Sequence, residues 1–330
     1  MSNKAIDRSE YTVMKIGATI LVVIGHITKF YIPEGGVVSV SPNMALGLIA
    51  KWIYLFHMPL FVFISGAIYS FNLNQQRKYR DFSCFFKKKF KRLIIPYLFW
   101  GIFFVTPVMV GFKFTNLSIA QYVFGCILMG GDSRHLWYLW TLFLLFCIFG
   151  VFQKYKKIVR SVCIILVFLL SCALYYITGL GPFWNVFYYG IFFSFGYLFD
   201  LYKNVIDNYS AGRVAPIILT FVLLSTGLFG RNNVAWNIVY ALSGIVFSYL
   251  FVKKAKTLFN CMNKWTILKK DSFGIYLIHP MLIYVIFYFC NNNIINPYFF
   301  SFITFGVVMF VSIILTEIIR RIHFQVVLGE

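Results

Sequence analysis

Charged side chains are scarce in this sequence: Asp, Glu, Lys and Arg make up 12% of its 330 residues, whereas hydrophobic residues make up 60%. A soluble domain carries about twice that share of charged residues, so the composition excludes a soluble protein. Apolar runs of about 17 to 25 residues recur along the chain, which is the length of a bilayer-spanning helix. The sequence therefore predicts an all-α, polytopic membrane helical bundle.

Acidic residues are scarcer still, with 10 Asp and Glu against 30 Lys and Arg. The predicted spans cover 13–32, 46–71, 93–112, 136–152, 161–178, 183–200, 214–230, 234–252, 273–290 and 298–318. If the N-terminus lies inside, the inner segments hold 25 of the 30 Lys and Arg, which is the positive-inside asymmetry. We therefore predict about ten transmembrane helices with both termini cytoplasmic. The net charge of +20 then reflects topology and anionic inner-leaflet lipid, and no nucleic-acid partner is expected.

Signatures of several other protein classes are missing. The 7 cysteines include no CxxC pair, so they predict small core side chains rather than a disulfide framework or a metal cluster. We expect no cleavable signal peptide, since the N-terminus is polar and the long first apolar run has no small-residue cleavage site. With no internal repeat or soluble segment, we expect residues 1–330 to form a single membrane domain without an appended soluble domain.

The first span contains an ionisable pair, Lys15 and His26. In a helix, the eleven steps from Lys15 to His26 turn back to within ~20° of the starting direction and rise ~16 Å, so both side chains share one face. Ionisable groups at membrane depth usually face a cavity or each other. The alternative is that Lys15 extends to the lipid headgroups and His26 is a hydrogen-bonded core residue.

The second span contains Phe-His-Met-Pro at residues 56–59, followed by a Ser-Gly pair that begins at Ser65. Pro59 is predicted to kink or loosen the helix that carries His57. By rise per residue, His26 and His57 differ in depth by only ~6 Å, so adjacent antiparallel helices would bring both imidazoles into one site. The alternative is a structural His57 that hydrogen-bonds a carbonyl freed by the proline.

The inner loop 72–92 is the most basic part of the chain and ends at Arg92, before Leu-Ile-Ile-Pro. Its other basic residues are Arg77, Lys78, Arg80, Lys87, Lys88, Lys89 and Lys91. Such a loop favours either a site for the phosphates of a nucleotide or coenzyme A, or a stop-transfer cluster that binds lipid headgroups. At the membrane edge, Arg92 is the residue that we expect to bind phosphate.

The outer segment 113–135 contains an apolar stretch, 117–129, that is too short to span and predicts a re-entrant or interfacial piece. It leads into a cluster of polar and aromatic residues: Asp132, Arg134, His135, Trp137 and Tyr138. Aromatic faces beside polar groups suit sugar rings, but they also form interfacial belts, and both interpretations stay open.

The ninth span begins with Asp271-Ser-Phe-Gly-Ile-Tyr-Leu-Ile-His-Pro, in which Tyr276 and His279 either line a cavity or pack in the core. No carboxylate lies at the centre of a predicted span, which weakens the case for proton-coupled transport.

Four of these patterns together resemble the acyltransferase-3 family of integral membrane acyltransferases. They are the basic residue and histidine of the first span, Phe-His-Met-Pro with Ser-Gly, Arg-Leu-Ile-Ile-Pro-Tyr from Arg92, and Ser-Phe-Gly-Ile-Tyr-Leu-Ile-His up to His279. His-Leu-Trp-Tyr-Leu from His135 is a weaker fifth pattern. Their order and spacing extend over nearly the full length.

The resemblance implies transfer of an acyl group, usually acetyl, from cytoplasmic acyl-CoA (acetyl-CoA) to a hydroxyl of a surface or lipid-linked glycan in a bacterial inner membrane. We predict that His26 is the general base or a transient acyl carrier, because a free hydroxyl is a poor nucleophile near pH 7. His57 would orient His26 or polarise the thioester. No metal is expected, because two buried histidines without a carboxylate make a poor zinc set.

Lys15 and Arg92 would bind the CoA phosphates. Lys15 stands where the family usually has Arg, and it lacks the planar fork for bidentate phosphate contacts. Candidates for lining the acceptor site are His135, Trp137, Tyr138, Tyr276 and His279. Some relatives add a periplasmic hydrolase-like domain, so this chain would act alone or pass the acyl group to a partner.

A transporter or flippase for a lipid-linked sugar is the main rival, since ten spans and aromatic grooves also suit that function. A polysaccharide polymerase or ligase would need larger outer loops than the longest one here. Dependence on acyl-CoA separates these functions. The acceptor sugar, the acyl chain length and assembly into a homo-oligomer stay open.

Overall fold

The computed structural model describes residues 9–33, 40–76, 81–155, 157–177, 184–204, 234–254, 266–290 and 295–330. These residues form helices and no strand, which confirms the predicted all-α class. Within the described ranges, 7 helical stretches are long and apolar enough to cross a membrane.

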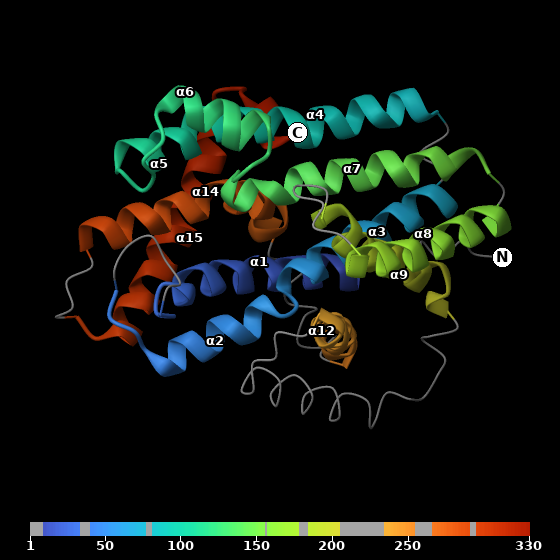
Figure 1. Cartoon of the computed structure of the whole chain (residues 1–330), viewed down its shortest axis with the longest axis horizontal. Coiled ribbons are helices and arrows are strands. Elements are labelled where there is room, and N and C mark those ends of the chain that lie inside the picture. The colour runs from blue at the N-terminus through green and yellow to red at the C-terminus, as the bar shows by residue number, and fades with distance from the viewer. Residues whose placement is uncertain are drawn as a thin grey trace.

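Helices cover the predicted spans that the structure describes, but the helix of the third span begins at Phe82, inside the predicted inner loop 72–92 (Figure 1). They are α1 (Ser9–Lys29), α2 (Met44–Tyr54), α3 (His57–Asn74), α4 (Phe82–Trp100), α5 (Thr106–Gly111), α6 (Ile119–Gln121), α7 (Trp137–Val151), α8 (Lys157–Ile177), α9 (Trp184–Leu201), α12 (Val234–Lys254), α14 (Thr266–Cys290) and α15 (Pro297–Arg321). A π-helical turn joins α4 to α5, and a second one extends α6 to Leu128. The predicted span 214–230 and the basic residues Arg77, Lys78 and Arg80 lie outside the described residues.

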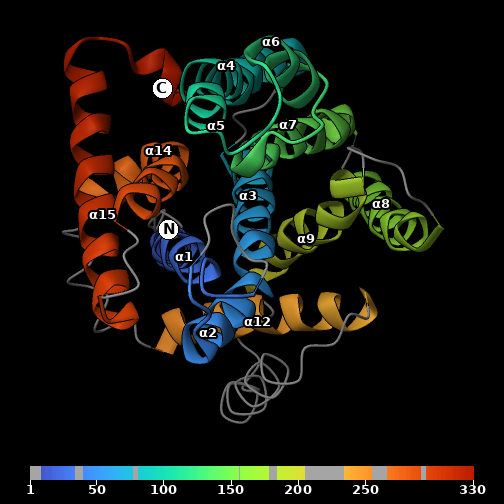
Figure 2. The ribbon, with the colours of Figure 1, turned by 60° about the vertical axis from the view of Figure 1, so that its left-hand side comes forward.

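Helix α1 is at the centre of the bundle and contacts α2, α3, α12, α14 and α15. Figure 2 shows α1 between α3 and α14, with α12 and α15 beyond them. A residue on α1 therefore faces other helices on most sides. This position explains how a half-buried ionisable side chain such as His26 can face the interior of the protein.

The second predicted span is interrupted, which corrects the expectation of one helix kinked by Pro59. Helix α2 ends at Tyr54 and α3 begins at His57. Pro59 is the third residue of α3, where a backbone N–H would have no intrahelical acceptor, so the proline removes no hydrogen bond. The break places His57 on the first turn of α3 instead of inside a continuous helix.

Helices α3 and α9 approach at backbone distance. A Cβ added to Gly66 would overlap the carbonyl of Phe193, and one added to Gly196 would overlap the carbonyl of Phe63. Glycine at both positions lets the two helices touch without side chains between them. This contact fixes α3, and with it His57, against the rest of the bundle.

The outer apolar stretch 117–129 forms a short helix over residues 119–128 that is too short to span, as predicted. It packs on α4, where the hydroxyl of Tyr97 donates to the carbonyl of Ile127 at 2.6 Å. The stretch therefore supports the loop that carries residues 130–136 toward the interior.

Candidate active site

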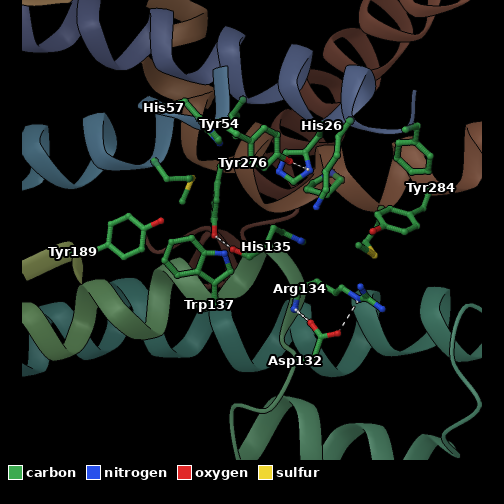
Figure 3. Close-up of a pocket in the computed structure, with 16 residues that line it drawn as sticks. His26, Tyr54, His57, Asp132, Arg134, His135, Trp137, Tyr189, Tyr276 and Tyr284 are labelled. Carbon is green, nitrogen blue, oxygen red and sulfur yellow. Dashed lines mark hydrogen bonds and ion pairs between the residues drawn. The ribbon is translucent and has the colours of Figure 1, made fainter. Parts of the chain in front are cut away.

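A cavity of about 310 Å³ opens between α1, α3, α14 and the segment that leads into α7 (Figure 3). Its walls combine aromatic and ionisable side chains, and we call it the histidine cavity. The lining residues are Val22, His26, Lys29, Phe30, Tyr54, His57, Met58, Asp132, Arg134, His135, Trp137, Tyr189, Tyr276, Pro280, Met281 and Tyr284. Its volume is at the lower end of the range for small-molecule sites.

Four of the chain's 5 histidines gather here. His26, His57 and His135 line the cavity, and His279 packs behind His26 with ring centroids 5.1 Å apart. His26 and His57 therefore lie in one site, as their predicted depths required. His135, one of the candidates for lining the acceptor site, reaches the same cavity from a different part of the chain.

Tyr54 lies between His26 and His57. Its ring centroid is 6.0 Å from that of His26 and 4.7 Å from that of His57, and its hydroxyl is 3.5 Å from Nδ1 of His26. Nothing in the sequence singles out Tyr54, because a tyrosine in an apolar, aromatic-rich span carries no distinctive signal.

Backbone hydrogen bonds fix the rings of His57 and His279. Nδ1 of His57 lies 2.8 Å from the carbonyl oxygen of Ile53, and Nδ1 of His279 lies 2.7 Å from that of Ile275. Since a carbonyl only accepts, both Nδ1 atoms carry the proton, and Nε2 of each neutral ring is an acceptor. The alternative for His57 was a hydrogen bond to a carbonyl freed by Pro59, whereas the bond observed is to Ile53, and Nε2 of His57 remains for the cavity.

Two buried imidazole nitrogens have no hydrogen-bond partner in the described part of the chain, Nε2 of His279 and Nδ1 of His135. Nε2 of His135 is 3.1 Å from the carbonyl oxygen of Leu277. Buried polar atoms in proteins are nearly always paired. The two nitrogens therefore give the histidine cluster spare capacity for hydrogen bonding.

Asp132 and Arg134 lie at the edge of the histidine cavity. An oxygen of the Asp132 carboxylate accepts the backbone N–H of Arg134 at 3.2 Å, and the other oxygen lies 3.5 Å from its Nε. Burial raises the pKa of Tyr122 to about 12, so its hydroxyl stays protonated and donates to the Asp132 carbonyl at 3.3 Å. These bonds hold the loop against the cavity.

A second cavity, of about 170 Å³, lies between α1, α3, α4, α7 and α14, and we call it the basic cavity. It contains the predicted pair Lys15 and Arg92 together with Lys89, and no carboxylate lines it within the described ranges. Its other lining residues are Phe61, Ile64, Ser65, Ile68, Tyr69, Asn72, Leu93, Tyr138, Leu142, Phe146, Ser272, Phe273 and Tyr276. Three cations facing one small space favour an anionic ligand.

Lys89 is the functional candidate that sequence reasoning missed in this cavity. Its Nζ lies 3.6 Å from the centroid of the Phe146 ring, inside the protein, whereas its neighbour Lys88 is exposed. Lys89 and Arg92 are three residues apart on α4 and so share a face. This spacing is visible in the sequence and groups Lys89 with Arg92, but it does not tell which face of α4 points inward.

Tyr276 lines both cavities. Its hydroxyl donates to the carbonyl of His135, and its ring lies 5.5 Å from that of Tyr138, which lines the basic cavity. Lys15 and His26 lie in successive cavities along the same side of α1, as the helical spacing predicted. The two cavities are therefore neighbours, with tyrosine side chains at their junction.

The remaining candidates divide between the two cavities. Trp137 and His135 line the histidine cavity, whereas Tyr138 lines the basic cavity. His279 is fully buried and does not line either one. Among the described residues, no group of three or more His, Cys, Asp and Glu side chains is arranged to hold a metal ion.

Most of the chain matches a known protein family. The family described as "Acyltransferase domain" matches residues 8–318, a region that includes both cavities. No curated protein matches the chain, and no solved structure does.

Proposed function

The chain belongs to this acyltransferase family, and from that premise we propose that it moves an acetyl group from cytoplasmic acetyl-CoA to a hydroxyl of a surface or lipid-linked glycan. We place the enzyme in a bacterial inner membrane, with both termini in the cytoplasm. The observation that carries the proposal is the pair of adjacent cavities with opposite chemistry. One offers cations to a donor, and the other offers imidazoles and aromatic rings to an acceptor.

The donor would enter the basic cavity. CoA carries several phosphates, and Lys15, Lys89 and Arg92 supply positive charge without a competing carboxylate in the cavity wall. The thioester end would then extend along α1 toward Tyr276, where the two cavities meet. The path would begin at Lys15, near the start of α1, and end at His26, deeper in the same helix.

The acceptor would lie in the histidine cavity, where aromatic rings pack on the sugar. The His26 imidazole takes the hydroxyl proton, and the sugar oxygen attacks the thioester carbonyl carbon. A C–O bond forms, the C–S bond breaks, and the proton on His26 passes to the departing thiolate to give free CoA. His57 and Tyr54 would hold the His26 ring in place, a role that their distances allow.

The test compares cells that express the wild type, His26→Asn, His323→Asn or no protein. The measurement is the amount of alkali-labile acetyl ester on surface glycans, together with the amount of inserted protein. We expect esters with the wild type and with His323→Asn, because His323 is exposed and lies outside both cavities. His26→Asn should lower the ester content by about 100-fold or more, since general bases contribute about 10² to 10⁴ in rate.

Equal ester content in all four cultures, in a host that makes the native glycan, would reject the acyltransferase proposal. Glycan that reaches the surface only with the protein, and carries no ester, would instead favour a transporter. Loss of esters with His323→Asn as well, at normal insertion, would reject the assignment of His26 as the base.

A further inference from the structure

The mouth of the histidine cavity carries an uncompensated positive charge. Lys29 and Arg134 line it, and Asp132 is the only carboxylate among its lining residues in the described part of the chain. Asp132 is already engaged with Arg134. Nζ of Lys29 lies 5.4 Å from the centroid of the Tyr54 ring. Two cations and one anion leave one positive charge facing the cavity.

The backbone of Arg134 is held in an unfavourable conformation. Its φ of +50° is in the left-handed region, which side chains other than glycine rarely adopt. The Asp132 carboxylate stabilises this geometry by accepting the backbone N–H of Arg134. Strained residues of this kind cluster at sites that bind ligands.

Lys29 and His26 lie on one side of α1, because residues three apart occupy adjacent positions on a helix face. Their Cα atoms are therefore about one helical turn, ~5 Å, apart. This separation suits a ligand whose anionic group and reactive hydroxyl are on the same small molecule. The wall of the cavity also includes Trp137 and Tyr189, whose ring centroids are 4.8 Å apart.

We propose that the acceptor is an anionic sugar, with a carboxylate or phosphate on the same unit as the hydroxyl that is acylated. This inference rests on the acyl-transfer function proposed above. Arg134 and Lys29 bind the anionic group, since a guanidinium pairs with the oxygens of carboxylate and phosphate in a bidentate manner. Trp137 and Tyr189 contact the ring, and the hydroxyl faces His26.

The test uses the purified full chain in lipid nanodiscs, radiolabelled acetyl-CoA and methyl glycosides of three sugars. Each sugar is supplied in a neutral form, as the uronic acid and as the 6-phosphate. Binding and acetyl transfer are measured separately for each acceptor. We expect at least one sugar to show about tenfold tighter binding and faster transfer in an anionic form than in its neutral form. The uronic acid and phosphate arms tell which anion is preferred.

Substitution then assigns the preference to the two cations. Lys29→Gln and Arg134→Gln should each reduce the anionic-to-neutral ratio by about tenfold, the size of a charge-assisted hydrogen bond. Binding of the neutral glycoside should be unchanged, and Arg134→Lys should keep part of the ratio. Lys51→Gln is the matched control, because Lys51 is an exposed lysine of α2 outside both cavities.

The outcomes separate the two proposals. Two outcomes would overturn the proposal of an anionic acceptor while leaving acyl transfer intact. One is equal binding and transfer for the neutral and anionic forms, and the other is a preference for the anionic form that both Gln variants retain. Preferential binding of the anionic glycosides without any transfer keeps the anion site and rejects the acyltransferase. Thermal unfolding and acetyl-CoA binding of each variant show that a lost preference does not come from lost folding.

Discussion

The imidazole rings of His26 and His279 lie against each other, with centroids 5.1 Å apart and planes inclined at 71°. His26 lines the histidine cavity, whereas His279 is fully buried behind it. The ring of His279 is held by its hydrogen bond to the Ile275 carbonyl. His279 is therefore in a position to orient His26 and not to touch an acceptor.

Replacing His279 with Ala should lower kcat by about 10- to 100-fold, because small displacements of a catalytic group have effects of that size. KM for acetyl-CoA should stay within about twofold, since His279 contacts neither cavity. His279→Asn should recover part of kcat, because its amide can still donate to the Ile275 carbonyl. Steady-state kinetics of the three proteins check this prediction. A raised KM with unchanged kcat would instead mean that His279 binds a substrate.

If the cations of the basic cavity bind the CoA phosphates, removing one of them should weaken the binding of acetyl-CoA without slowing the chemical step. Lys89→Met should raise KM for acetyl-CoA by about tenfold or more, which corresponds to one charge-assisted hydrogen bond, and should leave kcat nearly unchanged. Lys88→Met is the matched control, because Lys88 is the adjacent exposed lysine. Repeating both titrations with acetyl-pantetheine, which lacks the nucleotide phosphates, should abolish the difference between the variants. A difference that persists with acetyl-pantetheine would contradict phosphate binding by Lys89.

The fold and part of the site could be predicted because the length of a membrane span and the periodicity of a helix can both be recognised in a short stretch of sequence. The spacing of Lys15 and His26 placed both on one side of α1, and matching depths brought His57 to His26. These predictions needed only the rise and turn of a helix.

Other features depend on packing that no local pattern encodes. The orientation of α4 about its own axis determines that Lys89 faces inward and Lys88 outward. In the sequence, both are members of one basic run and cannot be told apart. Pro59 predicts a kink in a continuous helix, whereas the helix is interrupted before His57, two residues ahead of the proline. Tyr54 joins the site only because α2 ends beside α3, so its role needs the tertiary arrangement.

Tyr276 lies at the junction of the two cavities, so we expect it to keep water away from the thioester of bound acetyl-CoA. Tyr276→Ala should open the junction and raise hydrolysis of acetyl-CoA relative to acetyl transfer, because water then reaches the thioester. Tyr276→Phe keeps the ring and loses only the hydrogen bond to the His135 carbonyl, which is worth about 0.5–1.5 kcal/mol. It should therefore lower transfer by a few-fold without added hydrolysis. Assays that follow free CoA and acetylated product together check the ratio, and an unchanged ratio in Tyr276→Ala would show that Tyr276 does not shield the thioester.

The contact of α3 with α9 predicts a strong dependence of stability on one methyl group. Gly66→Ala should lower the free energy of unfolding by about 1–3 kcal/mol, because its Cβ would overlap the carbonyl of Phe193 in the facing backbone. The matched control is Gly306→Ala on the exposed side of α15, where a Cβ meets no atom within 4 Å. That change should raise stability by about 0.5–1 kcal/mol, since alanine is the better helix former. Thermal unfolding of both variants in the same detergent measures the contrast. Similar melting temperatures for Gly66→Ala and the wild type would contradict the close approach of the two helices, and with it the way in which His57 is fixed at the cavity.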